Sequence, residues 1–434
     1  MVDRKTFSAR FISLSVASVC LMLGVVPGLQ GAESPTRVAD FLPDDYVRDG
    51  SVSYHDEIQR AIDEAARTGG VLEFPPITYA TTEQGWQLRS GLTLLLDGAV
   101  FQLSDACRED VAVFHGRDVT DVTLRGGEIV GRNDVWPDGV NVRGVHVTGK
   151  SARIRIEGMR FRDLSSNGIG LFGTEDALIR DVWVRDVIVE NCCKRYPDYL
   201  SKEKPERGSQ REDQGDVALY FVEDFVVTGC RFERSRSDGT HFYRCRRGQI
   251  TDNRIYRAKM GGYFIETCAS VIGRGNVMLE NGSRGTTIER GATNCVFADN
   301  VVSLSGREGL WAPDCLGLVV TGNVFDRNGR KPNGPERRFL WNANITINEA
   351  AGEPTDSPTR DYLVSDNLIY TTSSQIAAIR VDAVEDAANL VIRDNVLLGE
   401  NQRLLVEGPN RAEVHLGDNH GAKGEVVAPP DGEP

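Results

Sequence analysis

A short motif that returns every two dozen residues constrains this chain more than any other feature of its sequence. Each copy has an alternating apolar run, a turn residue and a second alternating run, as in "ITDNRIYRA", "VFADNVVSLS" and "VVTGNVFDRN". The turn residue occupies seven positions, which are Cys230, Asn253, Asn276, Asn300, Asn323, Asn367 and Asn395. Weaker copies extend the series to Gly98, Gly127, Gly158, Asp181 and Asn419. Repeats of this kind predict one solenoid of about twelve turns.

The residues inside one repeat predict β-strands. Each period holds three short alternating runs with polar corners, which are too short for helix pairs and lack the periodicity of a helix. When the chain winds into coils, each run pairs in parallel with the same run of the next coil, about 4.8 Å away. The recurrent asparagine suits a tight corner, because it tolerates left-handed backbone and its amide forms local hydrogen bonds. We therefore expect an all-β solenoid with stacked corner amides.

The segment before the repeats predicts a helix that caps the first coil. "HDEIQRAIDEAARTGG" places Ile58, Ile62 and Ala65 on one face, and two glycines end the helix. A solenoid needs such a cap over its open end. Together with the asparagine-cornered repeats, this stretch and the following "FPPITY" resemble the pectate lyase superfamily of right-handed parallel β-helix proteins. Ile77 departs from the family form "FPxGxY".

The resemblance covers most of the chain and implies the right-handed parallel β-helix fold and a polysaccharide-active protein. It implies no particular activity, because many activities share this scaffold. The sequence lacks the paired aspartates, "GHG" and "RIK" of polygalacturonases and the "DPHD" of mannuronan epimerases. The arginine-rich and calcium-binding aspartate pattern of extracellular pectate lyases is not evident either. The candidate site therefore depends on how the repeats stack.

The first 32 residues have the pattern of a secretory signal peptide. Arg4, Lys5 and Arg10 precede an apolar run over 11–26, and small residues follow it. The run is short for a membrane anchor, and no later segment is apolar enough to span a bilayer. We expect residues 33–425 to form one exported domain, secreted or periplasmic, and residues 426–434 to form a mobile tail.

Composition narrows the classes of partner. The formal net charge of −13 and the isoelectric point of about 5.1 argue against nucleic acid. Eight cysteines follow the leader, and their spacing does not resemble that of a zinc site. Cys245 and Cys268 fall at the same place in successive repeats, so we expect them to pack in a stack. The sequence leaves the oligomeric state open.

The third run of each coil gathers residues that can carry chemistry. Strand alternation is expected to turn one apolar column inward, namely Leu219, Phe242, Ile265, Ile288 and Trp311. The neighbouring column then faces outward and contains Tyr220, Tyr243, Glu266, Glu289 and Ala312, with His241 beside it. The stretch "SDGTHFYRC" is one rung of this surface, which combines proton-transfer groups from four coils. The surface is the predicted catalytic site.

Glu266 and Glu289 predict a glycoside hydrolase. Equivalent positions on adjacent coils lie about 4.8 Å apart, and retaining glycosidases hold two carboxyls roughly 5–5.5 Å apart. Like charges this close raise the pKa of one carboxyl, which supplies an acid and a base at one pH. The simplest assignment makes Glu289 the nucleophile and Glu266 the acid/base, and the reverse assignment stays open. This chemistry requires no cofactor.

A polysaccharide lyase or uronan epimerase is the alternative on the same surface. Tyr243 or His241 would remove the C5 proton of a uronate, and a cation would neutralise the sugar carboxylate. The arginines available for that role are Arg244, Arg284, Arg290 and Arg307. Bound Ca²⁺ would serve a lyase in the same way, although no ligand cluster is convincing. A non-catalytic carbohydrate-binding β-helix is a third hypothesis.

Further residues near this surface are expected to bind the polysaccharide. Tyr220 and Phe264 face outward and are candidates for stacking against sugar rings. Asp216 and Asp238 begin two of the rungs and are candidates for hydrogen bonds to sugar hydroxyls.

Two insertions are expected to border the surface as loops, one after Asp181 and one after Asn323. Both are rich in lysine and arginine, including Lys194 and Arg338. Basic walls on an acidic protein would attract an anionic chain. The predicted partner is therefore a polysaccharide, with an anionic one favoured.

Overall fold

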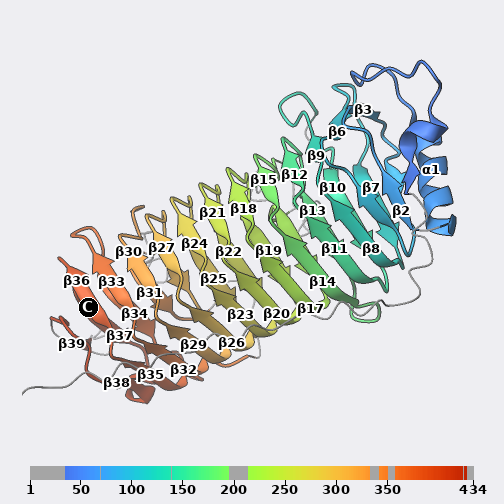
Figure 1. The fold of residues 1–434 in the computed structure, drawn as a ribbon. Coiled ribbons are helices and arrows are strands. Elements are labelled where there is room, and N and C mark those ends of the chain that lie inside the picture. The colour runs from blue at the N-terminus through green and yellow to red at the C-terminus, as the bar shows by residue number, and fades with distance from the viewer. Residues whose placement is uncertain are drawn as a thin grey trace, which may run out of the picture. The chain divides into compact units, whose positions relative to one another are not determined.

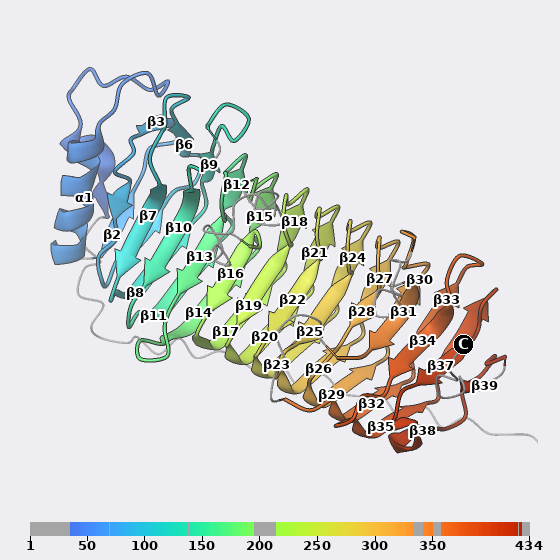
Figure 2. The ribbon, with the colours of Figure 1, turned by 180° about the vertical axis from the view of Figure 1, so that it is seen from behind.

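Three parallel sheets run side by side along the chain, and successive coils add strands to each sheet in turn. The computed structural model describes residues 35–68, 70–137, 139–194, 214–332, 342–349, 357–423 and 425–427. All of them belong to one compact unit, Pro35–Pro434. Figures 1 and 2 show the coils stacked one on another, beginning beside helix α1 (His55–Thr68). The predicted parallel β-helix is confirmed.

The strands in the described part of the chain divide among the sheets as follows. The fourteen-stranded sheet contains β1 (Thr36–Arg37), β2 (Val71–Glu73), β5 (Thr93–Leu95), β8 (Thr120–Arg125), β11 (Ala152–Glu157), β14 (Ile179–Arg185), β17 (Val222–Thr228), β20 (Arg246–Thr251), β23 (Ala269–Arg274), β26 (Thr293–Ala298), β29 (Leu316–Thr321), β32 (Arg360–Ser365), β35 (Ala388–Arg393) and β38 (Val414–Leu416). The twelve-stranded sheet contains β3 (Thr78–Thr81), β6 (Val100–Leu103), β9 (Glu128–Val130), β12 (Arg160–Arg162), β15 (Ile188–Glu190), β18 (Arg231–Glu233), β21 (Arg254–Tyr256), β24 (Val277–Leu279), β27 (Val301–Ser303), β30 (Val324–Asp326), β33 (Leu368–Thr371) and β36 (Val396–Gly399). The thirteen-stranded sheet contains β4 (Trp86–Gln87), β7 (Val111–Arg117), β10 (Val142–Thr148), β13 (Ile169–Phe172), β16 (Val217–Tyr220), β19 (Thr240–Tyr243), β22 (Tyr263–Glu266), β25 (Thr286–Glu289), β28 (Leu310–Trp311), β31 (Ala343–Ile347), β34 (Ala377–Asp382), β37 (Leu404–Glu407) and β39 (Glu425–Val427).

Helix α1 closes the N-terminal end of the solenoid, as predicted. Its side chains Ile58, Ala61, Ile62 and Ala65 are fully buried, and the helix packs against β2 and β4. Two short 3₁₀ helices, η1 (Val38–Phe41) and η6 (Arg411–Glu413), lie near the two ends of the described chain. The apolar face of α1 thus covers core residues that the first coil would otherwise expose to water.

The corner asparagines form the expected amide ladder. Asn276 donates from Nδ2 to Oδ1 of Asn300 at 3.0 Å, and Asn300 donates in the same way to Asn323 at 3.0 Å. The ladder differs from the prediction in its backbone, because the left-handed residue is the one before each asparagine. Asp299, for example, has φ 55°, and Gly275 has φ 67°. The asparagine is therefore selected for its amide, whereas the preceding aspartate or glycine makes the turn.

One extra residue changes the register of the coils next to the predicted site. Glu266 pairs with Glu289, a step of 23 residues, but Ala269 pairs with Thr293, a step of 24. The added residue falls at the corner that contains Gly291, where φ is 82°. Because side chains alternate between the two faces of a strand, an alignment that omits this residue assigns the side chains of β28 to the wrong faces.

This shift corrects the predicted orientation of Trp311. Trp311 pairs with Thr287, which belongs to an outward column, and Leu310 takes the inward position. The prediction that Trp311 lies in the core was therefore wrong.

The two ends of the chain relate differently to the predicted domain limits. Val426 and Val427 belong to β39 and pair with β37. Residues 428–434 of the predicted tail lie outside the described residues, and the mobility of the tail stays a prediction. The predicted signal peptide lies outside them as well. Within the described ranges, no helix has the length and hydropathy needed to cross a membrane.

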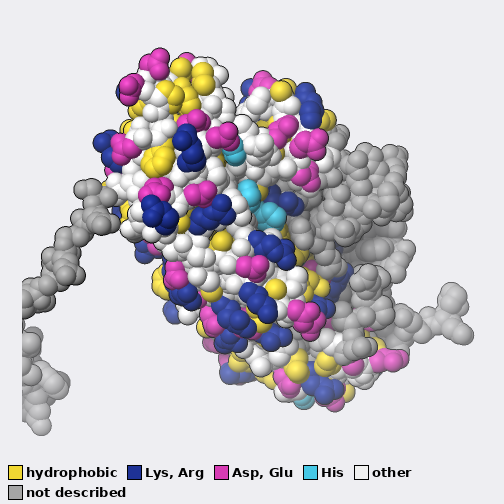
Figure 3. All heavy atoms as spheres, turned by 90° about the vertical axis from the view of Figure 1, so that its right-hand side faces the viewer, with side chains coloured by type: hydrophobic (Ala, Val, Ile, Leu, Met, Phe, Trp, Pro, Cys, Tyr) yellow, Lys and Arg dark blue, Asp and Glu magenta, His cyan; other side chains and the backbone are white. Residues whose placement is uncertain are grey.

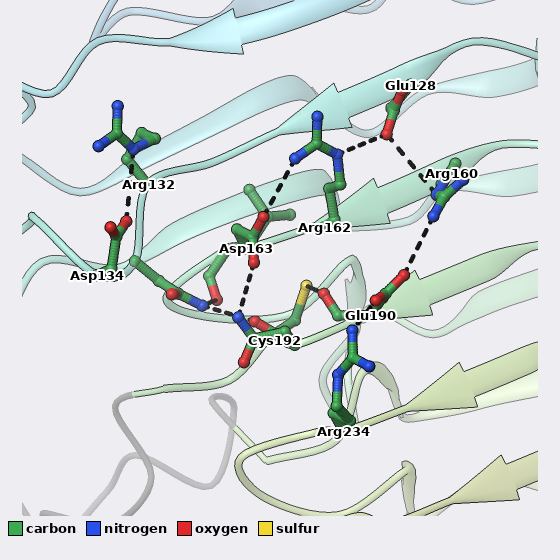
Figure 4. Close-up of polar contacts among 12 residues, drawn as sticks. Glu128, Arg132, Asp134, Arg160, Arg162, Asp163, Glu190, Cys192 and Arg234 are labelled. Carbon is green, nitrogen blue, oxygen red and sulfur yellow. Dashed lines mark hydrogen bonds and ion pairs between the residues drawn. The ribbon is translucent and has the colours of Figure 1, made fainter.

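Charged side chains on the outer surface are largely arranged in pairs. Figure 3 shows acidic and basic side chains intermixed on the face at the N-terminal end of the coils. In Figure 4, Glu128 receives a hydrogen bond of 2.7 Å from Nε of Arg162, and Arg160 reaches Glu190 on the next coil at 3.1 Å. Exposed pairs of this kind contribute about 0.2–1 kcal/mol each, so they order the surface more than they stabilise the fold.

The eight cysteines of the described chain are all buried and unbridged. Cys245 donates its backbone N–H to Sγ of Cys268 at 3.3 Å, which is the stacked packing expected from their positions.

Candidate functional site

The outward column of the thirteen-stranded sheet has the predicted register as far as Glu289. Tyr220 on β16 pairs with Tyr243 on β19, Tyr243 pairs with Glu266 on β22, and Glu266 pairs with Glu289 on β25. The turns that lead into these strands come from the twelve-stranded sheet and are tied to one another, since Gly262 N–H donates to Arg284 O at 3.1 Å. The strands and turns therefore present one continuous surface.

A pocket of about 240 Å³ opens on this surface. Its lining residues are Gln214, Asp238, Met260, Gly261, Phe264, Glu266, Ser283, Arg284, Thr287, Glu289, Arg290 and Trp311. The structure thus brings together six residues that the sequence assigned to the site, namely Asp238, Phe264, Glu266, Arg284, Glu289 and Arg290. Both catalytic glutamates of the hydrolase hypothesis are among them.

Arg290 lies between the two glutamates. One terminal nitrogen of Arg290 is 3.2 Å from Oε1 of Glu266, and its Nε is 3.6 Å from Oε1 of Glu289. Each glutamate is only 3 % exposed. Two carboxylates on neighbouring strands repel one another, and the guanidinium between them offsets that repulsion.

His241 lies beneath the pocket and does not line it. The side chain is fully buried, whereas the sequence predicted that it would be exposed. Its Nε2 is 3.3 Å from Oε2 of Glu266, and its Nδ1 is 2.9 Å from the hydroxyl of Tyr220. The imidazole also stacks on Phe264, with ring centres 4.4 Å apart and planes within 8°. His241 therefore reaches the pocket through Glu266.

Asp238 occupies the opposite end of the pocket from the glutamates, on the turn before β19. Burial raises the pKa of Asp238 to about 6, and the hydrogen bond from the backbone of Gly261 and the charge of Arg284 oppose that rise. Its Oδ1 accepts a hydrogen bond of 2.7 Å from the backbone N–H of Gly261. A Cβ on Gly261 would lie 2.9 Å from this oxygen, so any larger residue there would push the Asp238 carboxyl from its place.

Arg284, Trp311 and Glu308 form a group that the sequence reading did not recognise. The guanidinium carbon of Arg284 lies 3.7 Å from the centre of the Trp311 ring, and Nε of Arg284 is 3.2 Å from Oε2 of Glu308. Arg307 contacts the same oxygen at 3.4 Å, and burial lowers the pKa of Arg307 to about 10. Glu308 lies two residues before β28, and the sequence pattern assigned it no role. The step from β25 to β28 is 24 residues instead of 23. An alignment that allowed for this step would have placed Trp311 beside Arg284 on the outward face.

Several predicted site residues lie away from the pocket. Arg244 is exposed and its guanidinium covers the rings of Tyr243 and Phe221, at 5.4 and 5.5 Å from their centres. Lys194 donates to the backbone carbonyl of Asn133, several coils from the glutamates. Arg338 and most of the basic residues of the two insertions lie outside the described residues.

Asp216 requires a correction. Its side chain is fully buried beside Cys193 and Ser235, and burial raises the pKa of its carboxyl well above the usual range. Because no part of Asp216 reaches the surface, the structure contradicts its assignment to substrate binding.

The described ranges contain no group of three or more His, Cys, Asp or Glu side chains that could hold a metal ion. The calcium requirement of the lyase hypothesis, like the absence of a cofactor in the hydrolase hypothesis, stays a prediction.

Three solved structures illustrate what the fold resembles. The A-module of a mannuronan C-5 epimerase from Azotobacter vinelandii aligns with a TM-score of 0.66 at 13% identity and covers 91% of this chain and 100% of that one. PfbA, a surface adhesin of Streptococcus pneumoniae, aligns at 0.54 with 13% identity, over 91% and 93% of the two chains. The tailspike protein of the E. coli bacteriophage HK620, in complex with a pentasaccharide, aligns at 0.55 with 12% identity, over 89% and 78%.

At these identities the similarity concerns the fold alone. No curated protein sequence matches the chain closely enough to count as a relative. The family model described as "Right handed beta helix region" matches residues 143–325 and 215–416, which together span more than half of the sequence. The chain therefore belongs to the right-handed β-helix family.

Proposed function

We propose that this protein is a polysaccharide-cleaving glycoside hydrolase whose reacting carboxyls are Glu266 and Glu289. The observation that carries the proposal is that these residues are register partners on adjacent strands and line one pocket. Adjacent strands lie about 4.8 Å apart, which is near the roughly 5–5.5 Å between the carboxyls of retaining glycosidases. The spacing supports hydrolysis with retention of configuration at the anomeric carbon.

The chemistry needs one carboxylate and one protonated carboxyl. The carboxylate attacks the anomeric carbon while the carboxyl protonates the departing glycosidic oxygen, which leaves as an alcohol. The second group, now a carboxylate, takes a proton from water, and the hydroxide formed displaces the sugar from the first. Arg290 fits this sequence because it contacts both glutamates and offsets the negative charge that passes between them.

The fold relatives support a polysaccharide as the substrate. One relative is a mannuronan epimerase, and another was solved with a pentasaccharide. One of them is a surface adhesin, which agrees with the predicted export of this chain. A β-helix that only binds carbohydrate is therefore included as a possible result of the test below.

The charges in the pocket bear on the sugar that binds there. Arg290 is paired with Glu266 and Glu289, and both Arg284 and Arg307 are paired with Glu308. The guanidiniums are thus balanced by carboxylates inside the site. This balance of charge favours a neutral sugar at the bond that is cleaved. If the polysaccharide is anionic, its negative groups would bind the basic residues of the insertions after Asp181 and Asn323.

Elimination has weaker support from the geometry. Its candidate bases were Tyr243 and His241, and neither lines the pocket. His241 is fully buried and its Nε2 contacts Glu266, so it has no access to the C5 proton of a sugar. A lyase would therefore need a base other than Tyr243 and His241.

Incubation with a panel of neutral and anionic polysaccharides tests the proposal. Hydrolysis yields new reducing ends without ultraviolet absorbance, elimination yields unsaturated absorbing ends, and a binding protein yields neither. Glu266→Gln and Glu289→Gln should each lower the rate by about 10²–10⁴-fold. Glu280→Gln is the matched control, because Glu280 forms an exposed ion pair with Arg257 on the twelve-stranded side. Full activity in both site variants would refute the carboxylate pair.

A further inference from the structure

A line of polar contacts runs from a buried tyrosine to the pocket. The hydroxyl of Tyr220 is 2.9 Å from Nδ1 of His241, and Nε2 of His241 is 3.3 Å from Oε2 of Glu266. The three residues come from the consecutive coils of β16, β19 and β22. Tyr220 is 6 % exposed, His241 is fully buried and Glu266 is 3 % exposed. Of the three, only Glu266 lines the pocket, so the other two side chains are shielded from solvent.

For a neutral imidazole beside an ionised Glu266, the donors and acceptors fit this line in one order. A neutral imidazole has one N–H and one acceptor nitrogen. If the Tyr220 hydroxyl donates to Nδ1, then Nε2 carries the hydrogen and donates to the carboxylate of Glu266. The opposite tautomer would turn a lone pair of Nε2 toward the oxygen of Glu266, which is repulsive when the glutamate is ionised. The order Tyr220 to His241 to Glu266 thus ends on an ionised carboxylate.

The surroundings keep this arrangement rigid. His241 is held between Tyr220 and Phe264, whose ring lies parallel to the imidazole at 4.4 Å. Tyr220 is itself packed edge-on against Phe172, with ring centres 5.1 Å apart. Inside such an apolar enclosure hydrogen bonds are stronger than in water.

Two neighbouring donors stabilise the negative charge of Glu266. Arg290 contacts Oε1 of Glu266 at 3.2 Å, while His241 contacts Oε2, so both oxygens face donors. Within the described residues, the other titratable groups on this surface are Glu289 on β25, Asp238, Arg284, Arg307 and Glu308 on the turns, and Tyr243 on β19. Of these groups, Glu289 repels the charge of Glu266, and Arg290 lies between the two.

We propose that Tyr220 and His241 are positioning residues that hold Glu266 as the ionised nucleophile, and that Glu289 is the acid/base. The assignment rests on the proposed hydrolase function and reverses the roles first suggested by the sequence. In the first step an oxygen of Glu266 bonds to the anomeric carbon, and the proton of Glu289 goes to the leaving oxygen. In the second step Glu289 takes a proton from water, and hydroxide releases Glu266. His241 keeps its proton on Nε2 throughout.

The first test does not require activity. ¹⁵N-labelled histidine NMR of the full chain should show His241 as the neutral tautomer with hydrogen on Nε2, assigned by its loss in His241→Gln. Tyr220→Phe should change the tautomer population or broaden the His241 signals, whereas Tyr256→Phe, on the twelve-stranded sheet, should leave them unchanged. Hydrogen on Nδ1 in the wild-type protein would overturn the proposal.

The second test is the pH profile of cleavage. Tyr220→Phe should lower kcat about tenfold with little change in KM, and it should shift the acidic limb of the profile to higher pH, because Glu266 loses support for its charge. His241→Gln keeps an N–H donor near the position of Nε2 and should retain more activity than His241→Leu. Equal loss in both His241 variants, with circular dichroism unchanged, would contradict the positioning role.

The two proposals fail in different ways. A chain with the expected tautomer but no hydrolytic products would refute the hydrolase and leave the hydrogen-bond line intact. A chain that hydrolyses polysaccharide but carries hydrogen on Nδ1 of His241 would refute the line alone.

Discussion

The guanidinium of Arg284 lies flat against Trp311, with its central carbon 3.7 Å from the centre of the indole ring. This contact fixes one wall of the pocket, because Arg284 is also tied to Glu308. Trp311 is further held by a hydrogen bond of 2.6 Å from its Nε1 to Oδ1 of Asn348. The pair therefore combines a rigid ring with a cation at the edge of the candidate site.

We expect Trp311→Leu to weaken substrate binding. Trp311 lines the pocket, and a sugar that packs against its ring would lose about 1–1.5 kcal/mol of binding, so KM should rise roughly tenfold, with a smaller change in kcat. Trp183→Leu is the matched control, since Trp183 also lies under an arginine, Arg155, but on the exposed face of the fourteen-stranded sheet. Initial-rate kinetics on the active polysaccharide measure both. An unchanged KM in Trp311→Leu would show that this wall does not contact the sugar.

Arg290 should be needed in its full guanidinium form. Arg290→Met leaves two buried glutamates on adjacent strands without the cation between them, and activity should fall by about 10²-fold or more. Arg290→Lys should recover only part of it, because an ammonium cannot contact both carboxylates as a planar fork does. Arg257→Met, which removes an exposed partner of Glu280, serves as the control. If Arg290→Lys equals wild type in kcat/KM, the bridging role is wrong.

Asp238 should make the protein less stable as pH rises. Burial raises its pKa in the folded protein to about 6, from the ordinary value of 3.8. Between these values the folded state binds more protons than the unfolded state, so the free energy of unfolding falls with increasing pH. Two pKa units correspond to about 3 kcal/mol. Asp238→Asn removes this penalty and keeps an oxygen for the N–H of Gly261.

The prediction for Asp238→Asn is a pH-dependent gain. Urea unfolding should give equal stability for variant and wild type near pH 3.5, and a variant more stable by about 2–3 kcal/mol at pH 7.5. The measurement at low pH is the internal control. A constant difference across this range would mean that Asp238 does not titrate with a raised pKa.

The asparagine ladder should contribute measurably to stability. Asn300 accepts from the N–H and Nδ2 of Asn276 and donates to Asn323 and to Gly273 O, and it is 1 % exposed. Asn300→Ala should lower the free energy of unfolding by about 3–5 kcal/mol, because it leaves buried donors and acceptors unpaired. Arg67→Ala, on helix α1, removes an exposed ion pair with Glu64 and should cost less than about 1 kcal/mol. A similar decrease in the free energy of unfolding in both variants would show that the ladder does not stabilise the fold more than an exposed contact does.

The period of the repeat determined most of the fold and the central pair of the site. Residues 23 positions apart had to become vertical neighbours, which placed Glu266 opposite Glu289 and stacked the corner amides. This inference succeeded because parallel strands in a solenoid pair with the next coil, and the pairing follows directly from the spacing.

What the period could not supply was the direction and burial of individual side chains. The residue added near Gly291 reversed the face of Trp311, since strand faces alternate with every position. Asp216 and His241 were expected at the surface because their sequence positions border the outward column. Both are fully buried, Asp216 in the interior and His241 beneath Tyr220, Phe264 and Glu266.

The sequence alone thus determined that the chain winds into stacked coils and which residues meet on neighbouring strands. Only the tertiary structure decided which of those residues line a pocket, which support them from below, and which arginine separates the two glutamates. The physical reason is that register depends on local spacing along the chain, whereas burial and hydrogen-bond partners depend on side chains that pack together from several coils and two sheets.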